Sequence, residues 1–292
     1  MRQHFDDTAS PELEVARSLG ETSWRGPYAF IRVSNPGPRA SPEQKRRIME
    51  MIERESVPMM EGVDIRESYW RRRPDYLDRL SEWTIAEHRG RLVAWCGVCR
   101  WRAPMGRVLY VDTLAVMPGH RREGLGALLV FEAWCRWWGG RGSMPAISLR
   151  TQSPVVYAML HRFVPAITFP QLARLCVTPP PRAVDAATYT VAQTSPGKEF
   201  DPTTGVVRKA LDAAGSLYGR ELPFSGNACI DDFFARGMDV GAGDSLIAVV
   251  LWNWRTLVRA ALAYGFVLSQ LGRRLSPSEL KLPSPDQKAA GA

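Results

Sequence analysis

One short connection constrains this chain more than any other feature. Apolar and β-branched residues over 108–117 predict a buried strand, and residues 124–138 predict a helix with one apolar face. The connection between them reads Val116-Met-Pro-Gly-His-Arg-Arg-Glu-Gly-Leu-Gly-Ala127. Its glycines 124 and 126 stand where the chain enters the first helical turn, so the main-chain N–H groups there lack partners and are unhindered. A phosphate group can approach them, and the positive end of the helix dipole favours it.

Two well-known phosphate-binding motifs do not fit this connection. The dinucleotide pattern Gly-x-Gly-x-x-Gly fails because Leu129 stands where its third glycine would be. The P-loop pattern fails because no Gly-Lys-Ser/Thr follows. A tight turn without a ligand is the remaining alternative to a phosphate-binding loop.

The segments around this connection alternate between strand and helix patterns. Ser41, Pro42 and Gln44 fit the N-cap, N1 and N3 positions of a helix that runs to about residue 54. Pro74 kinks or splits a second helical stretch over 64–80. The other predicted elements are a strand over 28–33, a hairpin of 83–88 and 91–101 around Arg89-Gly90, a strand over 146–150 and a helix over 154–163. This order predicts an α/β fold with a mixed central sheet flanked by helices.

The domain organisation follows from where these patterns begin and end. We expect one domain over residues 27–274, and flexible segments over 1–26 and 275–292. The last strand and helix are predicted at 245–252 and 254–271.

Residues 179–244 are predicted to form a long insertion before the last strand. Three prolines at 179–181 and the polar stretch to about residue 201 predict a connection without regular structure. A helical segment is expected near 204–214.

The composition bears on partners and compartment. Lys plus Arg number 38 against 30 for Asp plus Glu, a formal net charge of +8, which suits an anionic partner without identifying it. No nucleic-acid-binding motif accompanies this charge. Five irregularly spaced cysteines give no disulfide framework, and no apolar leader is present, so we expect a cytoplasmic protein. Cys96 and Cys99 lack a second cysteine pair, so we expect no metal site.

The most apolar stretch, residues 246–268, is the nearest approach to a membrane span. Asn253, Arg255 and Arg259 interrupt it, and it fits a strand followed by a helix better. We therefore expect no integral membrane association.

The strand, Val-x-Pro, Arg-x-x-Gly-x-Gly and the apolar helix together resemble motif A of the GNAT superfamily of N-acyltransferases, which use acyl-coenzyme A. The resemblance is close over 108–138 and looser over 28–163. It implies that the loop cradles the coenzyme A pyrophosphate, and that the strand before it splays from the next one to admit the pantetheine arm. The implied cofactor contacts are Val116, Arg121, Arg122, Gly124, Gly126 and Ala127, with Leu114 and Ala115 lining the acyl and pantetheine side.

The resemblance also implies that an amine attacks the thioester directly, which requires a base and an acid. Asp112 is the implied base, and strand alternation predicts that it shares a face with Leu114 and Val116. Tyr157, on the predicted helix over 154–163, is the implied proton donor to the departing thiolate. A structural hydrogen bond for Asp112 and packing on the sheet for Tyr157 are the alternatives.

Several functions stay open within this resemblance. The donor is acetyl-coenzyme A or a longer acyl-coenzyme A, and the acceptor is an amine on a small molecule or a peptide. One alternative takes the acyl group from an acidic acyl carrier protein to a peptide or natural-product amine. Another is a catalytically silent module that binds coenzyme A or a partner through its apolar last helix. A homodimer is compatible with each, and the basic cluster Arg71-Arg-Arg73 predicts a solvated helix face.

Overall fold

The computed structural model describes residues 10–59, 64–140, 142–163, 168–172, 178–211, 216–218 and 221–273. Within these residues one nine-stranded sheet has the order β1-β2-β3-β4-β5-β6-β9-β7, and β8 also pairs with β9. The strands are β1 (Glu21–Arg25), β2 (Tyr28–Ser34), β3 (Glu82–His88), β4 (Arg91–Ala103), β5 (Gly106–Val116), β6 (Ala146–Thr151), β7 (Thr168–Phe169), β8 (Val206–Val207) and β9 (Ser245–Val250). The main helices are α1 (Pro11–Leu19), α2 (Pro36–Arg39), α3 (Pro42–Ser56), α4 (Ile65–Ser68), α5 (Tyr76–Arg79), α6 (Leu125–Trp138), α7 (Pro154–Phe163), α8 (Pro181–Thr194), α9 (Ala228–Arg236) and α10 (Trp254–Arg273).

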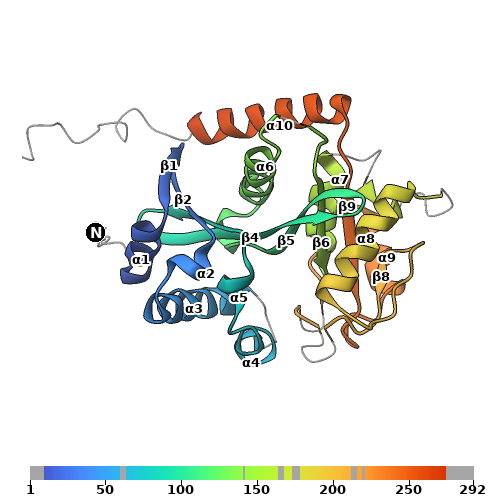
Figure 1. Ribbon diagram of the computed structural model, residues 1–292, viewed down its shortest axis with the longest axis horizontal. Coiled ribbons are helices and arrows are strands. Elements are labelled where there is room, and N and C mark those ends of the chain that lie inside the picture. Colours follow the sequence, from blue (N-terminus) through green and yellow to red (C-terminus); the bar gives the residue numbers. More distant parts are fainter. Residues whose placement is uncertain are drawn as a thin grey trace, which may run out of the picture.

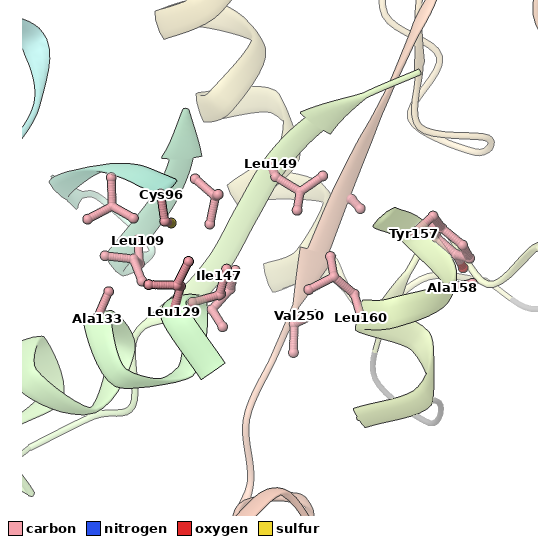
Figure 2. Packing of buried hydrophobic residues seen from close by; sticks show 14 of the residues in the cluster. Cys96, Leu109, Leu129, Ala133, Ile147, Leu149, Tyr157, Ala158, Leu160 and Val250 are labelled. Carbon is pink, nitrogen blue, oxygen red and sulfur yellow. The ribbon is translucent and has the colours of Figure 1, made fainter. Parts of the chain in front are cut away.

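Helices cover both faces of the sheet (Figure 1). Buried residues of α6 and α7 form one core, the α6 core, with β4, β5, β6 and β9 on one face of the sheet, the α6 face. Figure 2 shows Leu129 of α6 near Ile147 of β6, and Leu160 of α7 near Val250 of β9. Buried residues of α1 and α3 form a second core, the α3 core, on the opposite face of the sheet, the α3 face. A third core, built from α8, β6 and β9, continues that second face toward the far edge of the sheet. The predicted α/β fold with a mixed central sheet flanked by helices is confirmed, and the sheet is antiparallel except for the pair of β5 and β6.

The first part of the chain follows the sequence pattern closely. Ser41 caps α3 with a reciprocal capping box to Gln44, and the predicted apolar stripe of α3 is buried. The stretch over 64–80 splits into α4, a 3-10 turn (Trp70–Arg72) and α5, with Pro74 between the last two. The hairpin turns at Arg89 and Gly90, whose φ values of 51° and 72° both lie in the left-handed region.

The prediction of a flexible segment over 1–26 is wrong for residues 11–25. Ser10 caps α1, and Leu13 and Ala16, one helical turn apart, are fully buried in the α3 core. β1 then pairs with β2 along its whole length. The sequence pattern did not predict this short amphipathic helix, because only two of its residues, Leu13 and Ala16, are buried. Residues 1–9, like 275–292, lie outside the described residues.

The insertion is more ordered than its prolines suggest. Pro180 and Pro181 occupy the N-cap and N1 positions of α8, where a helix needs no N–H donor, so the prolines start a helix instead of preventing one. Ala183, Ala186, Ala187 and Val191 form its buried face. The helix predicted near 204–214 is also wrong over its described residues, because Val206 and Val207 form β8 beside β9.

A buried ion-pair network joins the sheet to α6. Glu82 of β3 is fully buried and accepts hydrogen bonds from Arg100 of β4, at 2.6 Å, and from Arg136 of α6. Arg136 also donates to Glu132 on its own helix at 3.1 Å. Glu132 accepts in turn from Tyr264 of α10 at 2.9 Å. Four elements therefore share one set of charges, and α6 is fixed in position on the sheet.

Glu82→Gln should lower the free energy of unfolding strongly. It leaves two guanidiniums without their carboxylate, and we expect a loss of about 3 kcal/mol, the lower end for breaking a buried pair, because both arginines are partly exposed. The matched control is Glu43→Gln, which also removes a carboxylate shared by two arginines, but on the exposed surface of α3. Chemical denaturation of both variants measures the difference. Equal midpoints would show that the buried network does not hold the fold.

Candidate functional site

The sheet opens between β5 and β6. The two parallel strands pair only from Val108 with Ala146 to Val111 with Leu149. Beyond this point β6 continues beside β9, whereas residues 113–116 of β5 pair with β4 alone. The strands therefore diverge at the carboxyl end of β5, as the GNAT resemblance implies for the pantetheine arm.

A β-bulge lies at the start of this divergence. In the β4–β5 ladder Gly97 pairs with Thr113 and Val98 with Val111, so Asp112 is the extra residue of β5. The side chains of Asp112 and Thr113 both contact residues of the segment over 64–80, on the α3 face of the sheet.

The bulge shifts the alternation of side chains along the rest of β5. Leu114 and Val116 pack with the α6 core, whereas Ala115 packs with the α3 core. The prediction that Asp112 shares a face with Leu114 and Val116 is therefore wrong, because an extra residue moves every later side chain to the other face. Of the residues expected to line the acyl and pantetheine side, Leu114 lies on the α6 face and Ala115 on the other.

The loop after β5 presents free backbone at the start of α6. Arg122 and Gly124 have φ values of 66° and 83°, so the chain makes a left-handed turn just before the helix. The N–H of Leu128 donates to Gly124 O at 2.9 Å as the first bond of the helix, so the amides of residues 125–127 precede that bond. These amides point toward the helix N-terminus, where an anion is favoured.

Gly126 lies where three elements meet. A Cβ on this residue would lie 3.5 Å from Met159 Sδ of α7, and 3.6 Å from the side chains of both Leu114 and Val116 of β5. These are ordinary contact distances, so the site tolerates one methyl group but not a larger branched side chain. Ala127, the next residue, lines a small apolar cavity between α6, α7 and the sheet.

Gly124 is constrained more strongly than Gly126. Besides its positive φ, a Cβ here would lie 2.9 Å from Val267 Cγ1 of α10. The C-terminal helix thus packs directly on the loop, and glycine is needed at residue 124 for both conformation and space.

The other side of the loop is held by Tyr28 of β2. Its buried hydroxyl lies 3.0 Å from His120 Nδ1 and donates to Glu123 Oε2. Arg121 Nε donates to Val116 O at 3.1 Å, which ties the loop back to β5. No local sequence pattern links Tyr28 to Glu123, since their contact joins residues 95 positions apart. Together these bonds fix the loop before any ligand binds.

Asp112 is engaged in a buried ion pair. Both of its carboxylate oxygens accept from Arg73 Nη2 at 2.7 Å, and its side chain is 2% exposed. Burial alone would lower the pKa of Arg73, but the attraction of Tyr69 and Asp112 raises it well above its usual range. The guanidinium also lies over the ring of Tyr69, 4.9 Å from its centroid. The prediction of a solvated face for 71–73 is therefore wrong at Arg73.

Tyr157 lies away from the loop. It is fully buried, its hydroxyl donates to Pro170 O, and the hydroxyl accepts from the Leu172 N–H at 3.4 Å. Burial raises the pKa of Tyr157 to about 12. Tyr157 and Leu160 lie one turn apart on α7 and belong to the same core, and Figure 2 shows Tyr157 farther from Val250 than Leu160 is. The structure does not bring this phenol to the residues around Gly126.

A different tyrosine reaches the end of β6 from the insertion. Gln152 is buried and accepts from the Leu217 N–H at 2.9 Å, while its own amide donates to Asp244 O at 2.9 Å. This pins residues 216–218 beside the start of α7. Burial raises the pKa of Tyr218, and a hydrogen bond with Ser153 partly offsets that shift. Nothing in the sequence marked Gln152, because its role depends on segments 65 and 92 residues away.

A parallel strand pair that splays beside a glycine loop at a helix N-terminus is the arrangement expected of a coenzyme A-dependent acyltransferase domain. Residues 49–158, from α3 to α7, match the family model described as the acetyltransferase (GNAT) family. This match covers 110 of the 292 residues, and it includes β3 to β5, the loop and α6. No curated protein matches the chain.

Solved structures with some similarity include several acetyltransferases. An aminoglycoside acetyltransferase from an uncultured soil metagenomic sample is 18% identical, with 42% of this chain and 78% of that chain covered and a TM-score of 0.31. The diaminobutyrate acetyltransferase of Paenibacillus lautus is 21% identical, with 46% and 72% covered and a TM-score of 0.28. These scores are too low to bear on the substrate.

Tyr157→Phe should change stability more than turnover. The variant loses the hydroxyl that satisfies Pro170 O in a buried position, and we expect the free energy of unfolding to fall by about 1 to 3 kcal/mol. Thermal melting and steady-state thiol release, measured on the same preparation, separate the two effects. A rate loss of tenfold or more at unchanged stability would return Tyr157 to the role of general acid.

Proposed function

We propose that this protein transfers an acyl group from an acyl-coenzyme A to an amine. The observation that carries the proposal is the divergence of β5 from β6 directly beside the pre-formed loop at the start of α6. An acyl-coenzyme A has two parts that need different environments, a charged pyrophosphate and a narrow, mostly neutral arm. The loop suits the first and the opening between the strands suits the second.

The amides of residues 125–127 would bind the pyrophosphate at the N-terminus of α6, with Arg121 and Arg122 supplying positive charge nearby. Leu114 and Val116 would form the wall along which the pantetheine arm enters. The loop needs little rearrangement for this, because Tyr28 and Arg121 already hold it. Rigid donors of this kind lose less entropy when the ligand binds.

The amine would approach from the α3 face, where Asp112 and Arg73 lie. Direct attack forms a C–N bond and breaks the thioester C–S bond, while the amine loses a proton and the thiolate gains one. Asp112 is a weak candidate for the base, since protonating it would break the pair with Arg73. We assign Asp112 to positioning Arg73. We assign Tyr218, whose hydroxyl is hydrogen-bonded to Ser153 just after β6, as the proton donor.

A second candidate is a module that binds coenzyme A without turnover. The specific observation in its favour is that Asp112 and Tyr157 are both engaged by other groups of the protein. Thiol release with a panel of amines, comprising an aminoglycoside, a diamino acid and a peptide N-terminus, separates the two functions. Mass spectrometry of a copurified thioester would identify the acyl chain.

Gly126→Val should weaken coenzyme A binding by displacing the loop from β5 and α7. The branched side chain enters the space between the loop, β5 and α7, and the lost charge-assisted hydrogen bonds correspond to on the order of 1 to 3 kcal/mol of binding free energy. Gly119→Val is the matched control, because this glycine lies in the same connection and has no atom within 4 Å of a built Cβ. Titration calorimetry with coenzyme A measures both. Equal affinities would exclude the loop as the coenzyme site.

Asp112→Asn should reduce the rate by a similar factor at every pH. Asparagine keeps the volume but weakens the hold on Arg73, so a positioning role predicts a loss that does not depend on the protonation of the amine. A base would behave differently, with the largest loss near neutral pH and the smallest at high pH, where free amine is abundant. The pH profile of kcat/KM distinguishes the two. A loss that disappears at high pH would show that Asp112 is the base after all.

A further inference from the structure

The outer face of α10 carries an exposed apolar stripe. Trp254, Val258, Leu262 and Phe266 are 66%, 57%, 71% and 63% exposed. Eight large hydrophobic side chains are exposed among the described residues, and these four on one helix are half of them. Successive members are four residues apart, so they lie on one side of the helix with a drift of about 40° per step. Ala261 and Gly265 lie between them and leave the stripe uninterrupted by polar groups.

The inner face of the same helix is already occupied. Leu257, Tyr264, Val267 and Leu268 pack on the α6 core, and Ala260 is buried. The helix is therefore apolar on both sides, and the fold accounts for only one of them. A soluble surface helix normally turns polar residues outward, so the stripe indicates a surface that binds something.

The charge around the stripe indicates the sign of that partner. Arg255 and Arg259 lie on the exposed side of α10, next to the stripe. The sequence contains no Asp or Glu between Asp244 and Glu279. A second copy of the helix would bring more arginines and no acids to the contact. An anionic surface, in contrast, would complement both the apolar stripe and its basic edge.

The position of α10 suits a flat partner. In Figure 1 the helix runs along the outer edge of the molecule, above α6 and toward β1. Its 20 residues extend over about 30 Å. Trp24 of β1, the strand at this end of the helix, is 65% exposed. No other described helix or strand lies beyond α10 on that side in Figure 1, and all four residues of the stripe are exposed.

We propose that α10 binds the surface of an anionic phospholipid bilayer, with Trp254, Val258, Leu262 and Phe266 entering the headgroup region and Arg255 and Arg259 contacting lipid phosphates. The helix would lie in the plane of the interface, where Trp and Phe are favoured beside basic residues. Among the described residues no helix is long and apolar enough to span a membrane, so the contact is with the surface. The proposal does not depend on the acyltransferase assignment.

Sedimentation with vesicles tests the proposal on the full chain. Vesicles of 70% phosphatidylcholine and 30% phosphatidylglycerol should bind the protein, and vesicles of phosphatidylcholine alone should bind at least tenfold less. Leu262→Glu should reduce binding to anionic vesicles by about ten- to a hundredfold, because it places a charge where the leucine side chain would enter the bilayer. Arg255→Gln and Arg259→Gln should each reduce it about fivefold and lower its salt dependence.

Phe224→Glu is the matched control, since Phe224 is 76% exposed but belongs to the loop before α9. It should leave vesicle binding unchanged, and circular dichroism should show that all variants stay folded. Equal binding to neutral and anionic vesicles would overturn the role of the arginines and with it the proposal. Absence of vesicle binding, together with a dimer in sedimentation velocity that Leu262→Glu dissociates, would assign the stripe to a second copy of the chain instead.

Discussion

One extra residue in β5 decides which side chains share a face beside the loop. Without the bulge at Asp112, Leu114 and Val116 would lie on the α3 face together with this carboxylate, and Thr113 would lie on the α6 face. With the bulge, the side chains of Asp112 and Thr113 both lie on the α3 face. The apolar side chains of Leu114 and Val116 lie on the α6 face. The bulge therefore puts the apolar pair Leu114 and Val116 and the buried ion pair of Asp112 and Arg73 on opposite faces of β5. The bulge also lies where the pairing of β5 with β6 ends. The opening between these strands and the change of side-chain faces along β5 therefore begin at the same residue.

The loop depends on support from three directions. Tyr28 holds it from β2, Val267 covers Gly124 from α10, and the network around Glu82 fixes α6, whose first turn supplies the amides. These contacts join residues far apart in the sequence, so they form only when the whole sheet is assembled. A site that relies on backbone donors needs such support, because the donors must stay aimed at the ligand for their electrostatic effect to be realised.

The sequence was sufficient for the loop and for most of the elements around it. The strand, the glycines and the apolar helix are local patterns, and each came out at or near its predicted position. The face of Asp112 could not be predicted, because a bulge is a property of two paired strands and leaves no mark in one of them. The same holds for Tyr157, whose partners Pro170 and Leu172 lie beyond its own helix. The sequence could have predicted α8, since the alanines that follow its first proline have the spacing of one helix face.

β9 and α10 are both rich in apolar residues, but for different physical reasons. Residues 246–268 are the most apolar stretch of the chain, yet β9 is apolar because it is a central strand buried on both faces. The inner side of α10 is apolar because it covers α6 and the loop, and this explains Val267 but not Phe266 beside it. Packing inside the protein cannot account for a residue that is 63% exposed. The fold does not account for the outer stripe, and the arginines along it favour a negatively charged partner.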